Sequence, residues 1–425
     1  MDARTIIIGL DGVPFGMIED FTKNGVMPNT AELLKQGLFK KMESSIPEVS
    51  SVAWSSMITG TNPGEHGTFG FMDLYPDSYK MKFPNYNDLK QPPFWDQWDG
   101  KSIIINVPST YPVREMNGVL ISGFVSIDFA KSIYPPSLVP LLRDLDYRLD
   151  VDARKAHTSM DLFLEDVDKT LSARIEAYRY LWSNYDWQTF MLVFTGTDRL
   201  MHFLWDAYED KNHKYHNYFL DHFRKIDHAV GEIISQARPD DLLVMHSDHG
   251  FERLDYDIYT SHLLAENGFL QFKDGADREL NNICYGTKAF VLDPARIHLN
   301  FKGKYPCGSV DQADAETILL ELESLFTGLE VEGREVVRDV YRKEHIYSGN
   351  CMDIAPEMVL VANEGFNFKA GVKSDKIASK AIFTGKHTQD TAFLLIKGLA
   401  DETIVPEVPK ISDIKSIIEK SKSPG

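Results

Sequence analysis

The chain has 425 residues, of which 43% are hydrophobic and 12% aromatic, so it holds enough apolar side chains for a sizeable core. Its formal net charge is −18, with 45 basic against 63 acidic residues, and no basic run or basic-aromatic stripe interrupts that balance. Composition therefore argues against a nucleic-acid polymer as partner. A small anionic ligand stays open, because bound metal ions reverse the local charge.

The cysteine pattern and the N-terminal residues bear on the cellular compartment. Cys284, Cys307 and Cys351 lie far apart and are odd in number, which argues against a disulfide framework or a cysteine metal knot. The first residues, MDARTIIIGLDG, lack the features of a secretory leader, and no apolar run approaches the roughly 18 residues of a membrane span. We expect a cytoplasmic protein without a membrane span, whose oligomeric state the sequence leaves open.

Short apolar runs alternate with longer helical patterns along the chain. In chain order we expect a strand at 5–10, a helix at 29–36, strands at 101–107 and 118–122, helices at 137–145 and 161–181, a strand at 189–194, a helix at 217–237, and strands at 242–245 and 391–397. Continuous apolar strands separated by helices predict a doubly wound α/β fold with a mostly parallel sheet covered on both faces.

Two segments depart from this alternation. Residues 71–100 are rich in Tyr, Pro, Asp and Asn and predict a long irregular loop beside a functional site. Residues 256–370 mix short strands with one helix at 313–326, which predicts a small inserted α+β subdomain. The core would then comprise residues 1–255 and 371–425.

Several polar residues follow the predicted strands. Open parallel sheets place their ligand sites at the carboxyl ends of strands. The residues found there or just before the last strand are Asp11, Asp198, His202, Asp248, His249 and His387. Each alone is typical of a turn, a helix cap or a loop. Together they predict a metal site, and the mixture of imidazoles and carboxylates suits Zn²⁺ or Mn²⁺.

A pair of serines begins a predicted helix in the stretch PEVSSVAW at residues 47–54. Ser50 or Ser51 would lie at the helix N-terminus, where free amides and the helix dipole favour an anion. An ordinary helix-capping serine explains the same pattern, so the local sequence leaves both roles open.

Taken as a set, the motifs resemble the alkaline phosphatase superfamily, and within it the type I phosphodiesterase/nucleotide pyrophosphatase branch. The resemblance lies in IIIGLDG at 6–12, PEVSSVAWSSMITGTNPGEHG at 47–67, FTGTDRLMH at 194–202, HSDHGF at 246–251 and GKHTQDTAFLL at 385–395. These motifs occur in the family's order and span nearly the whole chain. The resemblance implies an alkaline-phosphatase-like α/β/α sandwich.

The resemblance also implies a two-metal phosphohydrolase acting on a small phosphate ester. Asp11, Asp248 and His249 match the ligands of one metal ion, and Asp198, His202 and His387 match those of the other. Ser50 matches the nucleophile, which would bind the first ion and carry a covalent phosphoryl group. Two divalent ions are therefore expected, Zn²⁺ first and Mn²⁺ as the alternative.

Two departures from the family pattern concern the substrate. The usual threonine nucleophile is replaced by Ser50, the residue type that phosphomonoesterases use. Phe71 stands where nucleotide pyrophosphatases have a phosphate-contacting asparagine, while Arg199 could offer a guanidinium to phosphate or face solvent. We expect a phosphodiesterase or pyrophosphatase. A phosphomonoesterase and a catalytically silent metal-binding scaffold are the alternatives.

Overall fold

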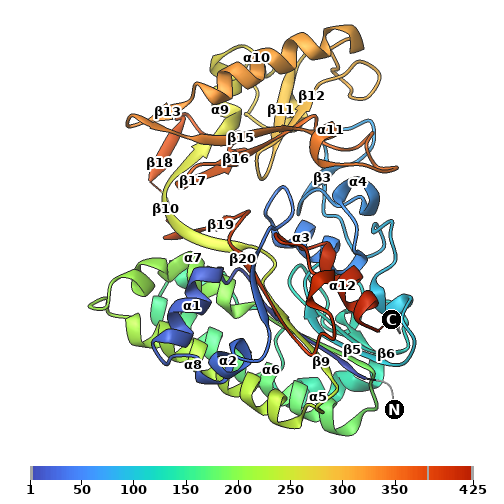
Figure 1. Ribbon diagram of the computed structural model, residues 1–425. Coiled ribbons are helices and arrows are strands. Elements are labelled where there is room, and N and C mark those ends of the chain that lie inside the picture. The colour runs from blue at the N-terminus through green and yellow to red at the C-terminus, as the bar shows by residue number, and fades with distance from the viewer. Residues whose placement is uncertain (1–2, 381, 423–425) are drawn as a thin grey trace. The chain divides into compact units, whose positions relative to one another are not determined.

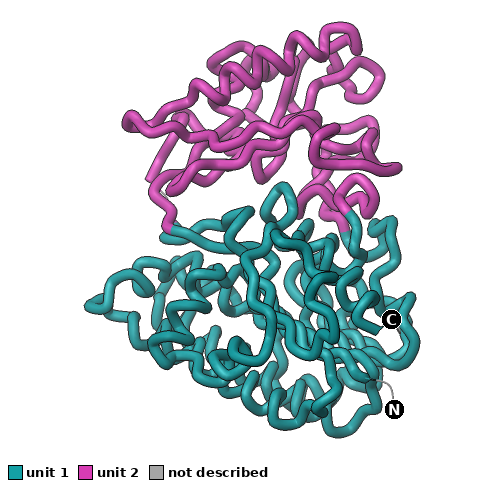
Figure 2. Tube along the Cα trace, in the orientation of Figure 1, with its two compact units in different colours: residues 1–61, 85–252, 383–425 teal, residues 62–84, 253–382 magenta. Residues whose placement is uncertain are grey.

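The computed structural model describes residues 3–380 and 382–422. The chain forms two compact units, coloured separately in Figure 2: unit 1 holds residues 1–61, 85–252 and 383–425, and unit 2 holds 62–84 and 253–382. Residues 256–370, predicted as an inserted subdomain, all lie in unit 2. The predicted loop 71–100 is divided between the two units.

Unit 1 is built on an eight-stranded sheet (Figure 1). Its spatial order is β2 (Leu38–Met42), β20 (Ala392–Lys397), β9 (Leu242–His246), β1 (Thr5–Leu10), β8 (Thr189–Phe194), β5 (Ser102–Val107), β6 (Gly118–Ser122) and β7 (Ile133–Tyr134). Neighbours from β9 to β6 pair in parallel, whereas β20 is antiparallel to both of its neighbours and β7 is antiparallel to β6. The mostly parallel sheet predicted from the apolar runs is confirmed.

Alternate residues of the central strands enter two separate cores, one on each face of the sheet. On β1, Ile6 and Ile8 pack with helices on one face, while Ile7 packs with helices on the other. The first face is covered by α1 (Phe15–Lys23), α2 (Pro28–Leu34), α5 (Val139–Asp144), α6 (Met160–Asn184), α7 (Gly196–Glu209) and α8 (His216–Gln236). The second is covered by α3 (Ser50–Thr59) and α12 (Asp413–Lys422). Unit 1 is therefore an α/β/α sandwich.

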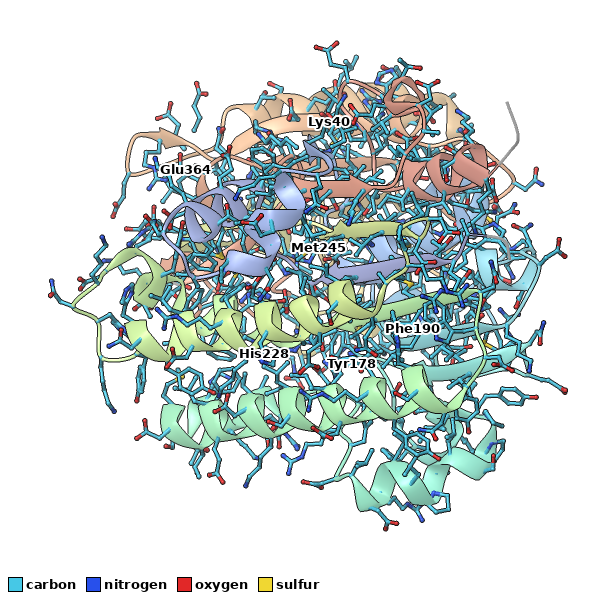
Figure 3. All side chains as sticks on the ribbon, turned by 60° about the horizontal axis from the view of Figure 1, so that its bottom comes forward. Lys40, Tyr178, Phe190, His228, Met245 and Glu364 are labelled. Atoms are coloured by element: carbon cyan, nitrogen blue, oxygen red, sulfur yellow. The ribbon has the colours of Figure 1, made fainter. Side chains whose placement is uncertain are left out.

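Local sequence explains where several of these helices begin and end. Pro28 occupies the first turn of α2, where its missing N–H is no loss. The Ser159 side chain caps the start of α6 by accepting a hydrogen bond from the Leu162 amide. Gly60 ends α3 in the left-handed region at φ 70°, which glycine adopts without strain. Figure 3 labels Tyr178 of α6 and Phe190 of β8, two aromatic side chains of the first core.

Unit 2 has its own apolar core and several small sheets. An antiparallel sheet has the order β11 (Ala289–Leu292), β12 (Arg296–Leu299), β16 (Met358–Ala362) and β15 (Val337–Arg342), and α10 (Ala315–Thr327) contributes Ile318, Leu322 and Phe326 to the same core. A second sheet has the order β17 (Gly365–Lys369), β10 (Gly250–Tyr259) and β18 (Ala378–Lys380), and α9 (Thr260–Glu266) follows β10. This unit mixes short strands with helices.

The remaining short elements are α4 (Pro63–His66), β3 (Asp73–Leu74), β4 (Met81–Lys82), β13 (Glu330–Val331), β14 (Arg334–Glu335), α11 (Lys343–Ile346) and β19 (Gly385–Thr388). Within the described residues, no helix is both long and apolar enough to cross a membrane.

Candidate active site

Four segments of unit 1 meet at one edge of its large sheet. Asp11 directly follows β1, and Asp248 and His249 follow β9. Asp198 and His202 lie on α7, which begins just after β8. His387 lies on β19, shortly before the antiparallel strand β20, so it approaches the edge at which the parallel strands end. Topology thus brings together the side chains that the strand-end pattern singled out.

The first cluster consists of Asp11, Asp248 and His249, whose ligand atoms all lie within 4.8 Å of one another. His249 Nε2 is 3.7 Å from Asp11 Oδ1 and 3.4 Å from Asp248 Oδ2. The Gly12 amide donates to Asp248 Oδ1 at 3.0 Å, whereas the buried Oδ2 has no hydrogen-bond partner. A buried carboxylate oxygen without a partner is costly unless a ligand binds it.

The second cluster consists of Asp198, His202 and His387. His387 Nε2 lies 3.0 Å from Asp198 Oδ1 and 3.0 Å from His202 Nε2. Two ring nitrogens this close require a proton or a cation between them. The two clusters adjoin, since Asp198, His249 and His387 also form a group of ligand atoms within 4.8 Å and the His249 and His387 rings stack at 3.7 Å.

All three histidines are oriented by main-chain carbonyls. The Nδ1 atoms of His202, His249 and His387 lie 3.1, 3.0 and 2.9 Å from the carbonyl oxygens of Gly385, Gly250 and Glu48. When the ring is neutral, donation from Nδ1 leaves the Nε2 lone pair free to bind a cation, and the Nε2 atoms lie at the clusters. Metal-binding histidines are commonly held in this way.

Burial and like charges disfavour the ionised carboxylates of the first cluster, Asp11 and Asp248. Burial, with Asp248 and Asp198 nearby, raises the pKa of Asp11 well above its ordinary value, and burial raises the pKa of Asp248 to about 7. Burial lowers the pKa of His202 to about 4 and that of His249 well below its ordinary value, which favours the neutral imidazole that binds metals. The residues present therefore fit a pair of divalent cations, whose charge would offset the carboxylate repulsion.

Ser50 lies beside the first cluster at the first residue of α3. Its Oγ is 3.2 Å from His249 Nε2 and 3.5 Å from Asp11 Oδ1. The Oγ of Ser51 is buried and has no hydrogen-bond partner. The structure thus distinguishes two serines that the local sequence left equivalent.

Three residues support the first cluster in ways that sequence reasoning did not identify. The Trp54 indole donates to Asp11 Oδ2 at 3.3 Å, the Thr197 hydroxyl donates to the Asp11 carbonyl at 2.6 Å, and the Ser44 hydroxyl donates to the Asp248 carbonyl at 2.7 Å. Trp54 is fully buried among apolar residues. Its position in the sequence therefore predicts an ordinary core side chain and does not indicate its hydrogen bond to Asp11.

The two residues predicted to contact substrate are Arg199 and Phe71, and they lie in different units of the structure. Arg199 donates to Asp198 Oδ2 at 2.7 Å and to Asp150 Oδ2 at 3.0 Å, and its side chain is 14% exposed. Phe71 lies in unit 2 and not in the unit that holds the clusters. Contact of either residue with substrate stays a prediction.

The sequence profile of the type I phosphodiesterase/nucleotide pyrophosphatase family matches residues 5–390. The chain belongs to this family. Family membership makes it a phosphoric ester hydrolase of the phosphodiesterase/pyrophosphatase type, and the predicted resemblance is confirmed. A search of curated proteins finds no match.

Solved structures of related fold include two enzymes. Phosphonoacetate hydrolase from Sinorhizobium meliloti, crystallised with phosphonoformate, has a TM-score of 0.66 at 14% identity, covering 99% of this chain and 96% of that chain. An inactive variant of murine ectonucleotide pyrophosphatase/phosphodiesterase 5, in complex with AMP, has a TM-score of 0.58 at 13% identity, covering 99% and 95%. At these identities the likeness shows the fold, and the predicted α/β sandwich is confirmed.

Proposed function

We propose that this family member is a two-metal phosphodiesterase or pyrophosphatase that uses Ser50 as its nucleophile. The observation that carries the proposal is the position of the Ser50 hydroxyl, 3.2 Å from His249 Nε2 and 3.5 Å from Asp11 Oδ1, within a cluster of candidate metal ligands. A hydroxyl at a helix N-terminus and beside cation ligands is well placed to act as an alkoxide.

Asp11, Asp248 and His249 would hold one ion, and Asp198, His202 and His387 the other. Zn²⁺ is the expected ion and Mn²⁺ the alternative, because the ligands mix imidazole and carboxylate. When bound, two such ions supply positive charge that stabilises the phosphoryl oxygens and lowers the pKa of the nucleophile.

The residues of the chain account for the two steps of the reaction. The Ser50 hydroxyl gives its proton to solvent, its Oγ attacks phosphorus, and the bond from phosphorus to the leaving oxygen breaks as that oxygen takes up a proton. Water then attacks the phosphorus of the phosphoserine and loses a proton, the bond from phosphorus to Oγ breaks, Oγ takes up a proton, and the phosphate product leaves. Ser50 begins α3, so the positive end of that helix dipole would stabilise the developing negative charge.

A monoester substrate is the second candidate. It is favoured by the serine nucleophile, where this branch usually has threonine, and by Phe71 at the position of the phosphate-contacting asparagine. A cytoplasmic location and a small phosphate-ester substrate remain predictions of the same proposal.

The test is a side-by-side rate assay with bis-p-nitrophenyl phosphate and p-nitrophenyl phosphate, each with added Zn²⁺ or Mn²⁺. Phosphonoacetate is a third substrate, since a protein of related fold hydrolyses it. Ser50→Ala should abolish turnover, while Ser51→Ala is the matched control because its hydroxyl contacts no polar group. A diester preference supports the proposal, and a monoester preference replaces it with the second candidate.

Two further results would contradict the chemistry. Full activity of Ser50→Ala would show that Ser50 is not the nucleophile. The silent scaffold would be favoured if the metal-loaded wild-type protein hydrolysed none of the three substrates. For that conclusion, the wild-type chain and Ser50→Ala must also bind nucleotide-sugar and dinucleotide diesters without hydrolysing them.

A further inference from the structure

The two oxygens of Asp198 have separate partners. Oδ1 faces the histidines, at 3.0 Å from His387 Nε2 and 3.4 Å from His202 Nε2. Oδ2 turns away from them and accepts a hydrogen bond from Arg199 Nη1 at 2.7 Å. The carboxylate is thus held at one oxygen while the other is presented to the cluster.

Arg199 is itself held on its far side. Its Nε and Nη2 donate to Asp150 Oδ2 at 3.2 and 3.0 Å, and the guanidinium carbon lies 4.1 Å from the centre of the Phe124 ring. Consecutive residues on a helix point in different directions, so Arg199 reaches the preceding Asp198 only because its side chain curls back. Asp150 and Phe124 fix that conformation.

We propose that Arg199 is a positioning residue for the second metal site, and that Asp150 locks it in place. The inference rests on the proposed two-metal function. It differs from the substrate contact predicted for Arg199, because the guanidinium could reach a substrate only by leaving two largely buried carboxylates, Asp150 and Asp198, without their cation.

Electrostatics agree with this geometry. Burial alone would lower the pKa of Arg199, but Asp150 and Asp198 together raise it above its ordinary value. The guanidinium therefore stays charged and offers planar, divergent N–H groups that a lysine cannot reproduce. Partners that orient metal ligands typically contribute about 10- to 100-fold to metal affinity.

The test is a titration of the metal-free full chain with Zn²⁺ in competition with a chromophoric chelator. The variants are Arg199→Gln, Arg199→Lys and Asp150→Asn. The matched control is Arg4→Gln, since Arg4 makes an equally close ion pair of 2.6 Å with buried Asp241, where β1 and β9 begin. Melting temperatures of all four variants show which of them retain the fold.

The wild-type chain is expected to bind two ions. Arg199→Gln and Arg199→Lys should each weaken one of the two binding events about 10- to 100-fold, and Asp150→Asn should weaken the same event less. At saturating Zn²⁺ the KM for bis-p-nitrophenyl phosphate should stay at the wild-type value. Arg4→Gln should lower the melting temperature without changing metal affinity.

Four outcomes would overturn the inference. Unchanged Zn²⁺ affinity with a raised KM would make Arg199 a substrate contact. Equal loss of affinity in Arg4→Gln would reduce the effect to general destabilisation. If the wild-type chain binds fewer than two ions, the proposed two-metal function fails and this inference fails with it. If the wild-type chain binds two ions and the Asp150 and Arg199 variants bind both as tightly, only the inference about Arg199 fails.

Discussion

The contact between Gly9 and Trp54 leads to a prediction that opposes the usual effect of replacing glycine in a strand. Gly9 is the second-to-last residue of β1, and a Cβ added there would be 2.5 Å from Trp54 Cη2 and 3.1 Å from Val193 Cγ2. Real Cβ contacts are essentially never shorter than 3.0 Å. Trp54 and Val193 are both fully buried, so neither side chain has space into which it can retreat.

Two effects of Gly9→Ala have opposite signs. Alanine has less backbone freedom to lose than glycine, which would stabilise a strand by about 0.5–1 kcal/mol. Overpacking a rigid core costs about 1–3 kcal/mol, and here the clash is with the wall of an indole ring. Packing therefore wins, and we expect a net loss of about 1–2 kcal/mol in the free energy of unfolding. Displacement of Trp54 should also weaken its 3.3 Å hydrogen bond to Asp11 and lower metal affinity.

The assay is urea unfolding followed by far-ultraviolet circular dichroism, which does not depend on tryptophan emission. Gly16→Ala is the matched control, because Gly16 lies in α1 with no atom within 4 Å of the added Cβ, and it should stabilise by at most about 1 kcal/mol. Trp54→Phe removes the clashing ring atoms, so Gly9→Ala should cost less in that background. Additive effects of the two substitutions, or a Gly9→Ala protein as stable as wild type, would refute the reasoning.

Three other predictions concern the metal clusters and unit 2. Asp248→Ala and His387→Ala should each lower the metal bound per chain, measured by elemental analysis, and unchanged content in either variant would contradict the two-site arrangement. Removing metal with a chelator should lower the melting temperature, and Zn²⁺ at 100 times its dissociation constant should restore about 2.7 kcal/mol per site, whereas no shift with Zn²⁺ or Mn²⁺ would count against metal binding. Arg296→Leu in unit 2 should destabilise by about 1–3 kcal/mol, because it leaves the carbonyls of Met72 and Asp293 without their buried donor; an unchanged calorimetric transition would show that these carbonyls find other partners.

Elements buried on a continuous apolar pattern were predictable from sequence. The six residues of β1 are all buried, and the structure has this strand at the predicted residues 5–10. The predicted helices 161–181 and 217–237 are observed as α6 and α8 with ends shifted by one to three residues, because their apolar stripes are long enough to dominate the pattern.

Edge strands and short helices were not predictable in this way. Strand β2 (Leu38–Met42) buries only Met42 and carries two lysines, which is typical of a protected sheet edge. It therefore lacks the continuous or alternating apolar residues from which a strand is predicted. Helix α1 places Met17, Ile18 and Phe21 in the core, but nine residues give too few turns for a clear period. Both elements form because tertiary packing supplies what the local sequence lacks.

Some residues of the candidate site were also predictable from sequence, and others were not. Ligand residues at strand ends were visible in sequence, because parallel strands deliver their carboxyl ends to one edge. The partners that orient those ligands were not visible. Asp150 contacts Arg199, and Trp54 contacts Asp11, but the two residues of each pair lie too far apart in sequence for a local pattern to relate them. The carbonyls that orient the histidines belong to the main chain, so no residue type marks them.

The order of strands in the large sheet also governs how the protein is made. Strand β1 is synthesised well before its partners β8 and β9, and loop closure over such distances in sequence slows folding. Until β20 arrives, β2 and β9 present unpaired edges that invite association with other chains. His387 reaches the site only with the segment that leads into β20. The same late segment therefore completes the ligand set and removes the exposed edges, so partly made chains are both inactive and the most prone to aggregate.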